Sequence, residues 1–335
     1  MGRAPWWLAL PTALIVLTVA DLVARSWQPG GERLSTGFSP LALIQRIDRA
    51  RSEQNPIVAL GDSVVWGYGV APSESAVSQL SRVLRRPVVN LSFEGGSPAN
   101  TYFVLRLLLA RGVRPGVVVF NVNDKTFNPD DSAYRRLHPS LERDVAAMLG
   151  RSDRQLLALQ PPGDFSAHIG AAVERIWRLY AIRADARAAL FGAEDAATAL
   201  ASATGDWTGR NARERRAHVA TADRFLGTYD LAPIGAENVA LRYLRATRDL
   251  LASQHIRYVA FLTPTNHRLL ADLIDVKEYR ANLALLAHAI SEPYGSVLDL
   301  DRAVPASDFL DNDHLTVAGN RMLAQRLAPL VATGS

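Results

Sequence analysis

The sequence contains no cysteine among its 335 residues. This absence excludes disulfide bonds, thiolate catalysis, cysteine-ligated zinc and a lipidated N-terminal cysteine, and it is compatible with an oxidising compartment. No run of Lys or Arg is interleaved with aromatic residues, so the net charge of +4 does not indicate a nucleic-acid partner. Internal repeats are also missing, which argues against a solenoid or array.

The composition that remains is that of a globular protein. Hydrophobic residues make up 48% of the chain and charged residues 21%, values that exclude extended disorder. The length leaves one or two domains open, because doubly wound folds with an insertion reach this size.

The first 27 residues do not resemble part of a soluble fold. Arg3 precedes an apolar segment from Trp6 to Ala24 that only Asp21 interrupts. About 18 to 20 apolar residues can cross a bilayer, whereas the apolar region of a signal peptide has about 7 to 15. No clean Ala-x-Ala cleavage site follows. We therefore expect residues 1–27 to be an uncleaved anchor with its N-terminus inside, with a cleaved signal or a buried helix as alternatives.

Either of the first two interpretations exports the rest of the chain. For a bacterial-looking sequence this predicts a single-pass protein of the inner membrane, with its remaining domain in the periplasm or outside the cell.

Residues 28–55 are predicted to be a linker with a helix over 41–52, and from Pro56 strands alternate with helices. This order predicts right-handed crossovers and a parallel sheet covered on both faces, a flavodoxin-like three-layer α/β sandwich built from residues 56–124 and 236–335. The expected strands are 57–60, 87–92, 116–122, 256–262 and 296–300, and the expected helices are 74–85, 100–111, 237–253, 277–290 and 317–331.

Residues 125–235 interrupt this pattern. They show no convincing strand and are rich in Ala and Arg, with helical patterns near 141–149, 171–190 and 213–226. A connection this long predicts a helical insertion that starts at the functional edge of the sheet and lies over it.

Polar residues follow three successive strands. Ser63 comes after the first, Gly95 after the second and Asn123 after the third. The carboxyl ends of parallel strands form the ligand-binding edge of such a sheet. A serine nucleophile there needs donors for the oxyanion of acyl transfer, and the N–H groups of Ser63 and Gly95 with the Asn123 amide can supply them. Each residue alone is more often an ordinary turn or capping residue.

A general base is expected from the loop before the last helix. His314 can accept the serine proton, and Asp311 can orient its ring and stabilise the imidazolium. A solvent-exposed histidine is the commoner outcome for such a residue. A metal site of Asp311, Asp313 and His314, with His267 as a further ligand, is another alternative.

In these blocks the chain resembles the GDSL/SGNH family of serine hydrolases. The resemblance implies an ester hydrolase or O-acyltransferase with Ser63 as nucleophile, His314 as base and Asp311 as its orienting acid, with Gly95 and Asn123 as oxyanion donors and no cofactor. One departure is Asn121, which stands where the family usually has glycine. The matching blocks are Gly61-Asp62-Ser63, Asn90-x-Ser92-x-x-Gly95, Asn123-Asp124 and Asp311-x-x-His314.

The anchor and the insertion make the chain similar to membrane-tethered members that move acyl groups on envelope polysaccharides, some beside a membrane-bound O-acyltransferase. Hydrolysis and transfer share every catalytic residue, so both stay open. A lipase or thioesterase acting on lipid esters, and a non-catalytic partner in polysaccharide modification, are the alternatives.

Two further groups of residues are candidates for substrate contact. Asn266 and His267 follow the fourth strand and could reach the substrate. The aromatic and arginine residues of the insertion, among them Trp177, Tyr180 and Arg183, could meet a sugar, an acyl group or an anionic head group, but packing within the insertion and solvated helix faces are the commoner outcomes.

Overall fold

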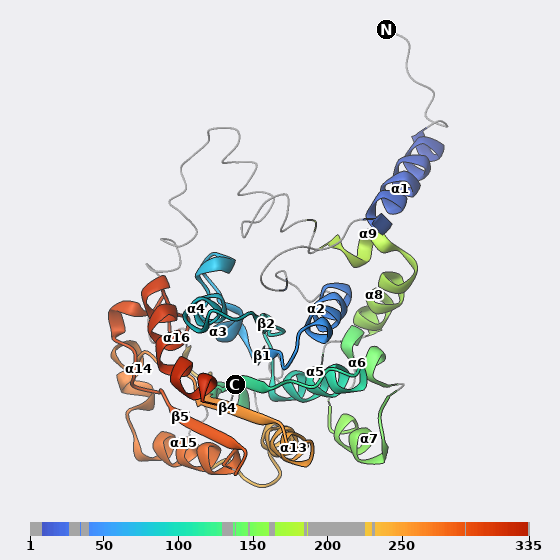
Figure 1. Cartoon of the computed structure of the whole chain (residues 1–335). Coiled ribbons are helices and arrows are strands. Elements are labelled where there is room, and N and C mark those ends of the chain that lie inside the picture. Colours follow the sequence, from blue (N-terminus) through green and yellow to red (C-terminus); the bar gives the residue numbers. More distant parts are fainter. Residues whose placement is uncertain are drawn as a thin grey trace, which may run out of the picture.

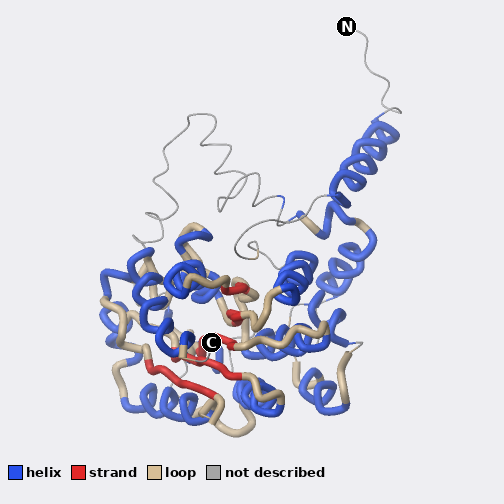
Figure 2. Tube along the Cα trace, viewed as in Figure 1, coloured by secondary structure: helices blue, strands red, loops and turns tan. Residues whose placement is uncertain are grey.

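A five-stranded parallel sheet forms the middle layer of the protein (Figures 1 and 2). The strands lie in the order β2-β1-β3-β4-β5, as the flavodoxin-like prediction requires. The computed structural model describes residues 9–26, 34, 40–128, 137, 139–146, 148–160, 165–183, 186, 225–229, 232–291 and 293–333. The strands are β1 (Ile57–Leu60), β2 (Val88–Asn90), β3 (Val117–Val122), β4 (Arg257–Leu262) and β5 (Gly295–Asp299).

Alternation along the strands divides the core into two. Val58 and Leu60 of β1 belong to one hydrophobic cluster, and Ile57 and Ala59 belong to the other, because successive side chains of a strand point to opposite faces. The first cluster includes residues of α2 (Pro40–Ser52), α5 (Pro98–Ala110), α13 (Val239–Ser253) and α15 (Lys277–Ala289). The second includes residues of α4 (Ala76–Leu84) and α16 (Val317–Ala332). The predicted three-layer sandwich is therefore confirmed.

Two helices of the α/β core were not expected. The four-residue α3 (Ser63–Trp66) starts at the proposed nucleophile, and α14 (His267–Ile274) follows β4. Asn266 caps α14, since its side chain accepts the backbone N–H of Leu269. The sequence analysis predicted no helix here, and α14 has only eight residues, which is too short for a clear periodic pattern.

The described part of the insertion is helical, as predicted. It contains α6 (Pro139–Ala146), α7 (Arg151–Leu157), α8 (Phe165–Ile176) and α9 (Arg178–Ala181). Helix α6 packs on α5, and α8 packs on α6 and α9, so these helices extend outward from α5 rather than from the sheet (Figure 1). The helix predicted near 213–226 lies almost wholly outside the described residues.

Helix α1 (Ala9–Ser26) projects from the body beside α9 (Figure 1). It has 18 residues with a mean hydropathy of 1.5, and in the described part of the chain it alone is long and apolar enough to cross a membrane. A signal sequence meets the same criterion.

Asp153 connects the insertion to the core and generates a prediction. It is buried and accepts hydrogen bonds from Tyr102 and Arg106 of α5, the latter at 2.6 Å. We expect Asp153→Ala to lower the free energy of unfolding by roughly 2–3 kcal/mol, because charged hydrogen bonds to a buried carboxylate are lost. Urea unfolding measures this.

Asp249→Ala is the matched control for that experiment. It removes the exposed partner of Arg248, and exposed ion pairs contribute at most about 1 kcal/mol. Equal losses in the two variants would contradict a structural role for Asp153.

Candidate active site

The turn after β1 presents Ser63 at the carboxyl edge of the sheet. Asp62 caps α3, and its Oδ1 accepts the N–H of Val64 at 2.8 Å. Gly61 has φ +139°, a conformation that L side chains rarely adopt. Ser63 is buried at the start of α3, so the local sequence Gly-Asp-Ser fixes both the turn and the position of the hydroxyl.

Asn121 holds this turn from the neighbouring strand. Its Oδ1 accepts the N–H of Asp62 at 3.2 Å, and its Nδ2 donates to Asp62 Oδ1 and Thr263 Oγ1, both at 2.9 Å. A Cβ on Gly61 would come within 2.1 Å of Asn121 Oδ1. Asn121, which stands where the resembled family usually has glycine, therefore occupies the space that the missing side chain of Gly61 leaves open.

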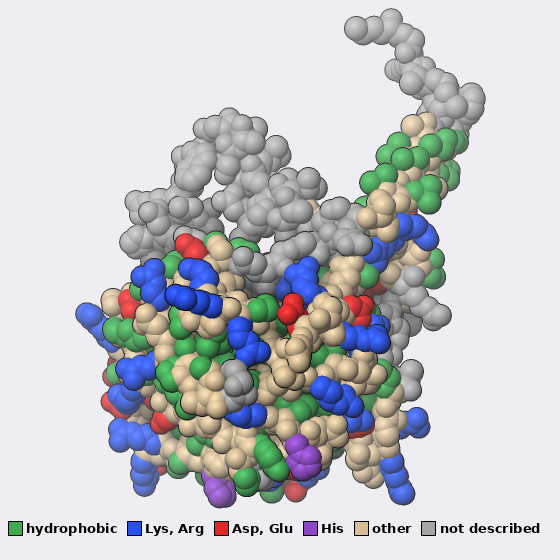
Figure 3. Space-filling view, viewed as in Figure 1, with side chains coloured by type: hydrophobic (Ala, Val, Ile, Leu, Met, Phe, Trp, Pro, Cys, Tyr) green, Lys and Arg blue, Asp and Glu red, His purple; other side chains and the backbone are tan. Residues whose placement is uncertain are grey.

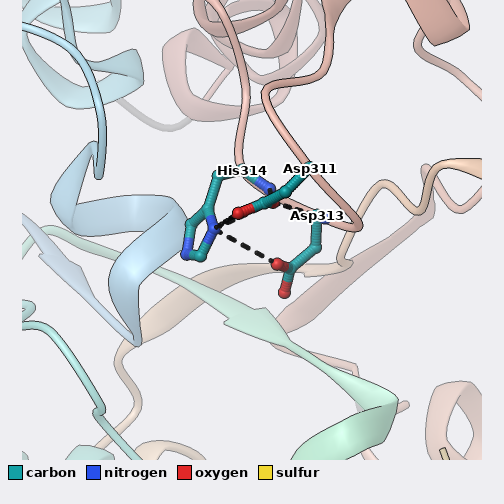
Figure 4. A group of neighbouring side chains, drawn as sticks. All are labelled: Asp311, Asp313 and His314. Carbon is teal, nitrogen blue, oxygen red and sulfur yellow. Dashed lines mark hydrogen bonds and ion pairs between the residues drawn. The ribbon is translucent and has the colours of Figure 1, made fainter. Parts of the chain in front are cut away.

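Ser63, His314 and Asp311 come together in the structure. Nε2 of His314 lies 2.8 Å from Ser63 Oγ, and its Nδ1 lies 2.7 Å from Asp311 Oδ2 (Figure 4 shows the His314 side). Asp311 Oδ1 also accepts the backbone N–H groups of Asp313 and His314. The Tyr68 ring packs on the His314 ring with centroids 4.3 Å apart. The nucleophile–base–acid geometry of acyl transfer is thus present.

The loop that carries Asp311 and His314 is held from several sides. The N–H of Leu310 donates to the carbonyl of His314 at 2.7 Å. Asn266 donates through Nδ2 to the carbonyl of Asp311 at 3.0 Å. Asn312 donates to the hydroxyl of Tyr229, a buried residue at the end of the insertion.

The two residues after β4 that were predicted to contact substrate, Asn266 and His267, have structural partners. Asn266 joins α14 to the Asp311 loop. The Nε2 of His267 lies 2.7 Å from Asp301 Oδ2. Their contact with substrate stays a prediction, and the structure places their side chains in the framework of the site.

A buried ion pair lies beneath the triad. Lys125 Nζ is 2.5 Å from Asp313 Oδ2, and both side chains are almost fully shielded from solvent. Asp313 Oδ1 lies 3.6 Å from Nδ1 of His314 (Figure 4). Sequence reasoning did not assign this pair a role. Adjacency to His314 was the only signal for Asp313, and the position after Asn123-Asp124 was the only one for Lys125.

The predicted oxyanion donors lie at the same edge. Gly96 packs so tightly against Gly61 and Asp62 that a Cβ would meet Gly61 O at 2.5 Å, which places the Gly95 turn beside the nucleophile turn. Asn123 donates through Nδ2 to Asp62 Oδ2 at 3.0 Å and to Asp313 Oδ2 at 2.7 Å. An oxyanion bound by Asn123 would share one of these hydrogens, so the oxyanion roles stay predictions.

The charges shift the pKa values of the proposed base and acid. Burial alone disfavours the charge of Asp311, but hydrogen bonds from the His314 ring and from backbone N–H groups outweigh it and lower its pKa to about 2. Burial also disfavours the His314 imidazolium, yet the carboxylates of Asp313 and Asp311 outweigh burial and raise its pKa above the ordinary value. Lys125 opposes this rise.

The alternative metal site consists of Asp311, Asp313 and His314, whose ligand atoms lie within 4.8 Å of one another. His314 Nδ1 is bonded to Asp311, and Asp313 is paired with Lys125. A divalent cation bound there would lie against the ammonium of Lys125, so the donor set does not fit a metal well. His267, the further ligand of this alternative, is bonded to Asp301 instead.

Comparison with protein-family models found no match, and comparison with curated proteins found none either. Solved structures gave similar folds. A lipolytic protein of the G-D-S-L family from Desulfitobacterium hafniense is 11% identical, with a TM-score of 0.37 and coverage of 83% of this chain and 99% of that one. TesA is 12% identical, with a TM-score of 0.41 and coverage of 84% and 99%. A family 2 carbohydrate esterase from Corynascus thermopiles (Myceliophthora fergusii) is 10% identical, with a TM-score of 0.39 and coverage of 84% and 67%.

Likenesses this distant carry no argument for function. The case for a reaction therefore rests on the side chains of this chain.

Gly61→Ala tests the clamp on the nucleophile turn. The added Cβ clashes with the Asn121 side chain. In addition, alanine must adopt the positive φ of Gly61, a strained backbone conformation that costs about 1–3 kcal/mol. We expect esterase activity to fall at least about tenfold, because a displacement of about 1 Å misaligns the reacting groups.

The double variant Gly61→Ala/Asn121→Gly is the control for this steric argument. It removes the obstructing amide and should recover part of the activity relative to Gly61→Ala alone. If Asn121→Gly lowers the activity of the Gly61→Ala variant by the same factor as it lowers the activity of the wild-type protein, the two residues are not coupled. The steric contact between them would then not explain the loss of activity.

Asp313→Asn tests the charge beneath His314. A general base must be neutral, so activity falls as the pH drops through the pKa of His314. Removing the carboxylate removes one cause of the raised pKa, and the acid limb of kcat/KM should move to lower pH. The pH profile with p-nitrophenyl acetate measures the shift.

Two variants control this measurement. Asp272→Asn removes an exposed acid on α14 and should leave the acid limb in place. Lys125→Met/Asp313→Asn removes the lysine that Asp313→Asn would leave buried without its partner, and should fold where the single variant does not. An acid limb that stays in place or moves to higher pH in Asp313→Asn would contradict the assignment.

Proposed function

We propose that the chain is a serine acyl-ester enzyme of the GDSL/SGNH kind, which forms an acyl intermediate on Ser63. The observation that carries the proposal is the bonded series from Ser63 Oγ to His314 Nε2 at 2.8 Å and from His314 Nδ1 to Asp311 Oδ2 at 2.7 Å. The four sequence blocks that resemble the family converge on this series, and the parallel sheet aligns them along one edge.

The geometry defines the first half of the reaction. Ser63 Oγ attacks the ester carbonyl while His314 Nε2 takes the hydroxyl proton. Asp311 stabilises the imidazolium, and donors at the Gly95 turn and Asn123 would stabilise the oxyanion. The intermediate collapses when the C–O bond to the alcohol breaks and His314 returns its proton to the leaving oxygen. An acyl-Ser63 ester and a free alcohol result.

The second half repeats these steps with a new nucleophile. His314 removes a proton from water or from an acceptor hydroxyl, whose oxygen attacks the acyl carbon, and Ser63 leaves with the proton that His314 returns. Water gives a carboxylic acid, and an acceptor hydroxyl gives a new ester. The catalytic groups are the same, so exclusion of water decides between hydrolysis and transfer.

A cavity beside the site supports a carbohydrate ester as substrate. It has a volume of about 300 Å³, and Asp124, the residue after Asn123, is one of the residues that line it. Apolar side chains such as Phe127 and Ile234 share its wall with the exposed side chain of Glu237. A wall of this kind can bind a sugar, whose ring faces are apolar and whose hydroxyl groups are polar. We propose an O-acyl, such as acetyl, group on envelope carbohydrate.

Helix α1 supports the location that the proposal requires. Its length and hydropathy suit a membrane anchor, and we propose that it holds the catalytic domain at the outer side of the cytoplasmic membrane. Envelope carbohydrate, or an acyl group handed over by a membrane-bound O-acyltransferase, would be within reach there.

Ser63→Ala in the full-length protein tests the reaction. The wild-type chain should release nitrophenol from p-nitrophenyl acetate and carry an acetyl adduct in intact-mass spectra. Ser63→Ala should lose the adduct and roughly 10⁴-fold or more in rate, because the nucleophile is absent.

Asp311→Asn should fold but lose roughly 10⁴-fold in kcat, because the imidazole loses its orienting acid.

Ser253→Ala, an equal change at an exposed serine of α13, should keep both rate and adduct. Faster release of long-chain acids than of acetate would favour the lipid-ester alternative. No adduct in the wild-type chain, together with no labelling of Ser63 by a fluorophosphonate, would favour a non-catalytic partner in polysaccharide modification.

A further inference from the structure

The C-terminal end of α1, where the helix meets the body of the protein, is bonded to the insertion. Asp21 Oδ1 accepts the backbone N–H of Leu179 at 2.8 Å, and Arg178 donates through Nε to the carbonyl of Ala24 at 3.4 Å. Asp21 also pairs with Arg25, one turn further along α1, at 2.9 Å. The single acid of the apolar segment thus serves to dock α1 on α9.

Helix α8 leads into this junction with an exposed apolar stripe. Ile169, Ala172, Val173 and Ile176 are spaced i, i+3, i+4 and i+7, which places them on one face of the helix. Ile169 is 49% exposed and Ile176 is 78% exposed, the highest value among the large hydrophobic side chains described. A globular protein in water would normally bury such a stripe.

Aromatic and basic side chains continue the stripe at α9. The rings of Trp177 and Tyr180 stack with centroids 6.0 Å apart, and the Arg183 guanidinium lies 3.9 Å from the centre of the Tyr180 ring. Tryptophan, tyrosine and arginine together are typical of the boundary between lipid tails and head groups. In Figure 3 the mostly hydrophobic surface of α1 ends at a group of Lys and Arg side chains.

We propose that α8 and α9 form a membrane ledge, a surface that lies in the interfacial region of the same bilayer that α1 crosses. The ledge comprises Ile169, Ala172, Val173, Ile176, Trp177, Tyr180 and Arg183. Its occupant is lipid, because the stripe leads into α9, which packs on α1, and α1 is itself apolar and exposed over most of its length. The inference rests on the membrane anchor of the proposed function.

The ledge would fix the orientation of the catalytic domain. Helix α9 packs on α8, α8 on α6, and α6 on α5. The first turn of α5 lies beside the active-site turns, since Pro98 and Thr101 line a small cavity with Gly61, Asp62 and Asn123. A path of packed helices therefore connects the bilayer to the turn that carries Ser63, and this packing would hold the active site at a defined height above the lipid.

The absence of cysteine makes the test direct, because each introduced cysteine is the only site for a thiol-reactive spin label. Ile15→Cys reports on α1, Ile176→Cys on the ledge, and Val83→Cys on an exposed apolar position of α4, which packs on the opposite face of the sheet. The full-length variants are placed in nanodiscs of phosphatidylethanolamine and phosphatidylglycerol. The relaxation of each spin label by oxygen, which partitions into lipid, is compared with its relaxation by a nickel chelate, which stays in water.

We expect the labels at positions 15 and 176 to be relaxed more strongly by oxygen, and the label at position 83 to be relaxed more strongly by the chelate. A label at 176 that behaves like 83 while 15 stays in lipid would overturn the ledge and leave the anchor intact. A label at 176 shielded from both reagents would mean that protein covers the stripe, which also overturns the ledge. An aqueous label at 15 would contradict the anchor, and the ledge with it. Acetyl-enzyme formation is measured separately, so failure of the esterase reaction is distinguishable from all three.

Asp21→Ala tests the dock between α1 and α9. Added to Ile176→Cys, it should reduce the preference of the label for oxygen, because the hydrogen bond that holds α9 at the bilayer is lost. Thr18→Ala is the matched control: it lies one turn earlier on α1 and bonds to Leu14 of its own helix. Equal effects of the two substitutions would contradict the docking role of Asp21.

Discussion

The active site depends on the accommodation of buried negative charge at the carboxyl edge of the sheet. Asp62 and Asp313 are almost fully shielded from water, and an unpaired buried carboxylate costs several kcal/mol. The amide of Asn123 donates to both carboxylates, and Lys125 neutralises Asp313. The turn that presents the nucleophile and the loop that presents the base are thereby joined by one polar network, which positions them without any covalent link.

The parts of this arrangement that could be predicted from sequence are those with a local signal. Short apolar runs that alternate with segments of helical periodicity predicted all five strands. Because these strands are parallel, the carboxyl ends of β1, β2 and β3 lie on one edge of the sheet. Ser63, Gly95 and Asn123 could be nominated because each comes within five residues of the end of a strand. Asp311 and His314 could be paired because only two residues of one loop lie between them.

What could not be predicted depends on contacts between segments far apart in the chain. Asn121 looked like a defect in the third block, yet it fills the space beside Gly61, sixty residues earlier in the sequence. Lys125 is the first residue of the segment predicted to be an insertion, and its partner Asp313 comes much later in the chain, in the loop before the last helix. Asn266 and His267 are at the predicted edge, but a short helix turns their side chains toward the framework. Burial and pairing of polar groups carry no periodic signal.

The bond between Asp21 and Leu179 also sets an order of events during synthesis. The two residues are 158 positions apart, so at about 5–20 residues per second roughly 8 to 32 seconds separate their emergence from the ribosome. During this interval Asp21 has Arg25 of its own helix as its partner. Attachment of α1 to α9 is therefore impossible until the first three strands have been made, and it becomes possible before β4, β5 and the residues that complete the triad have been synthesised.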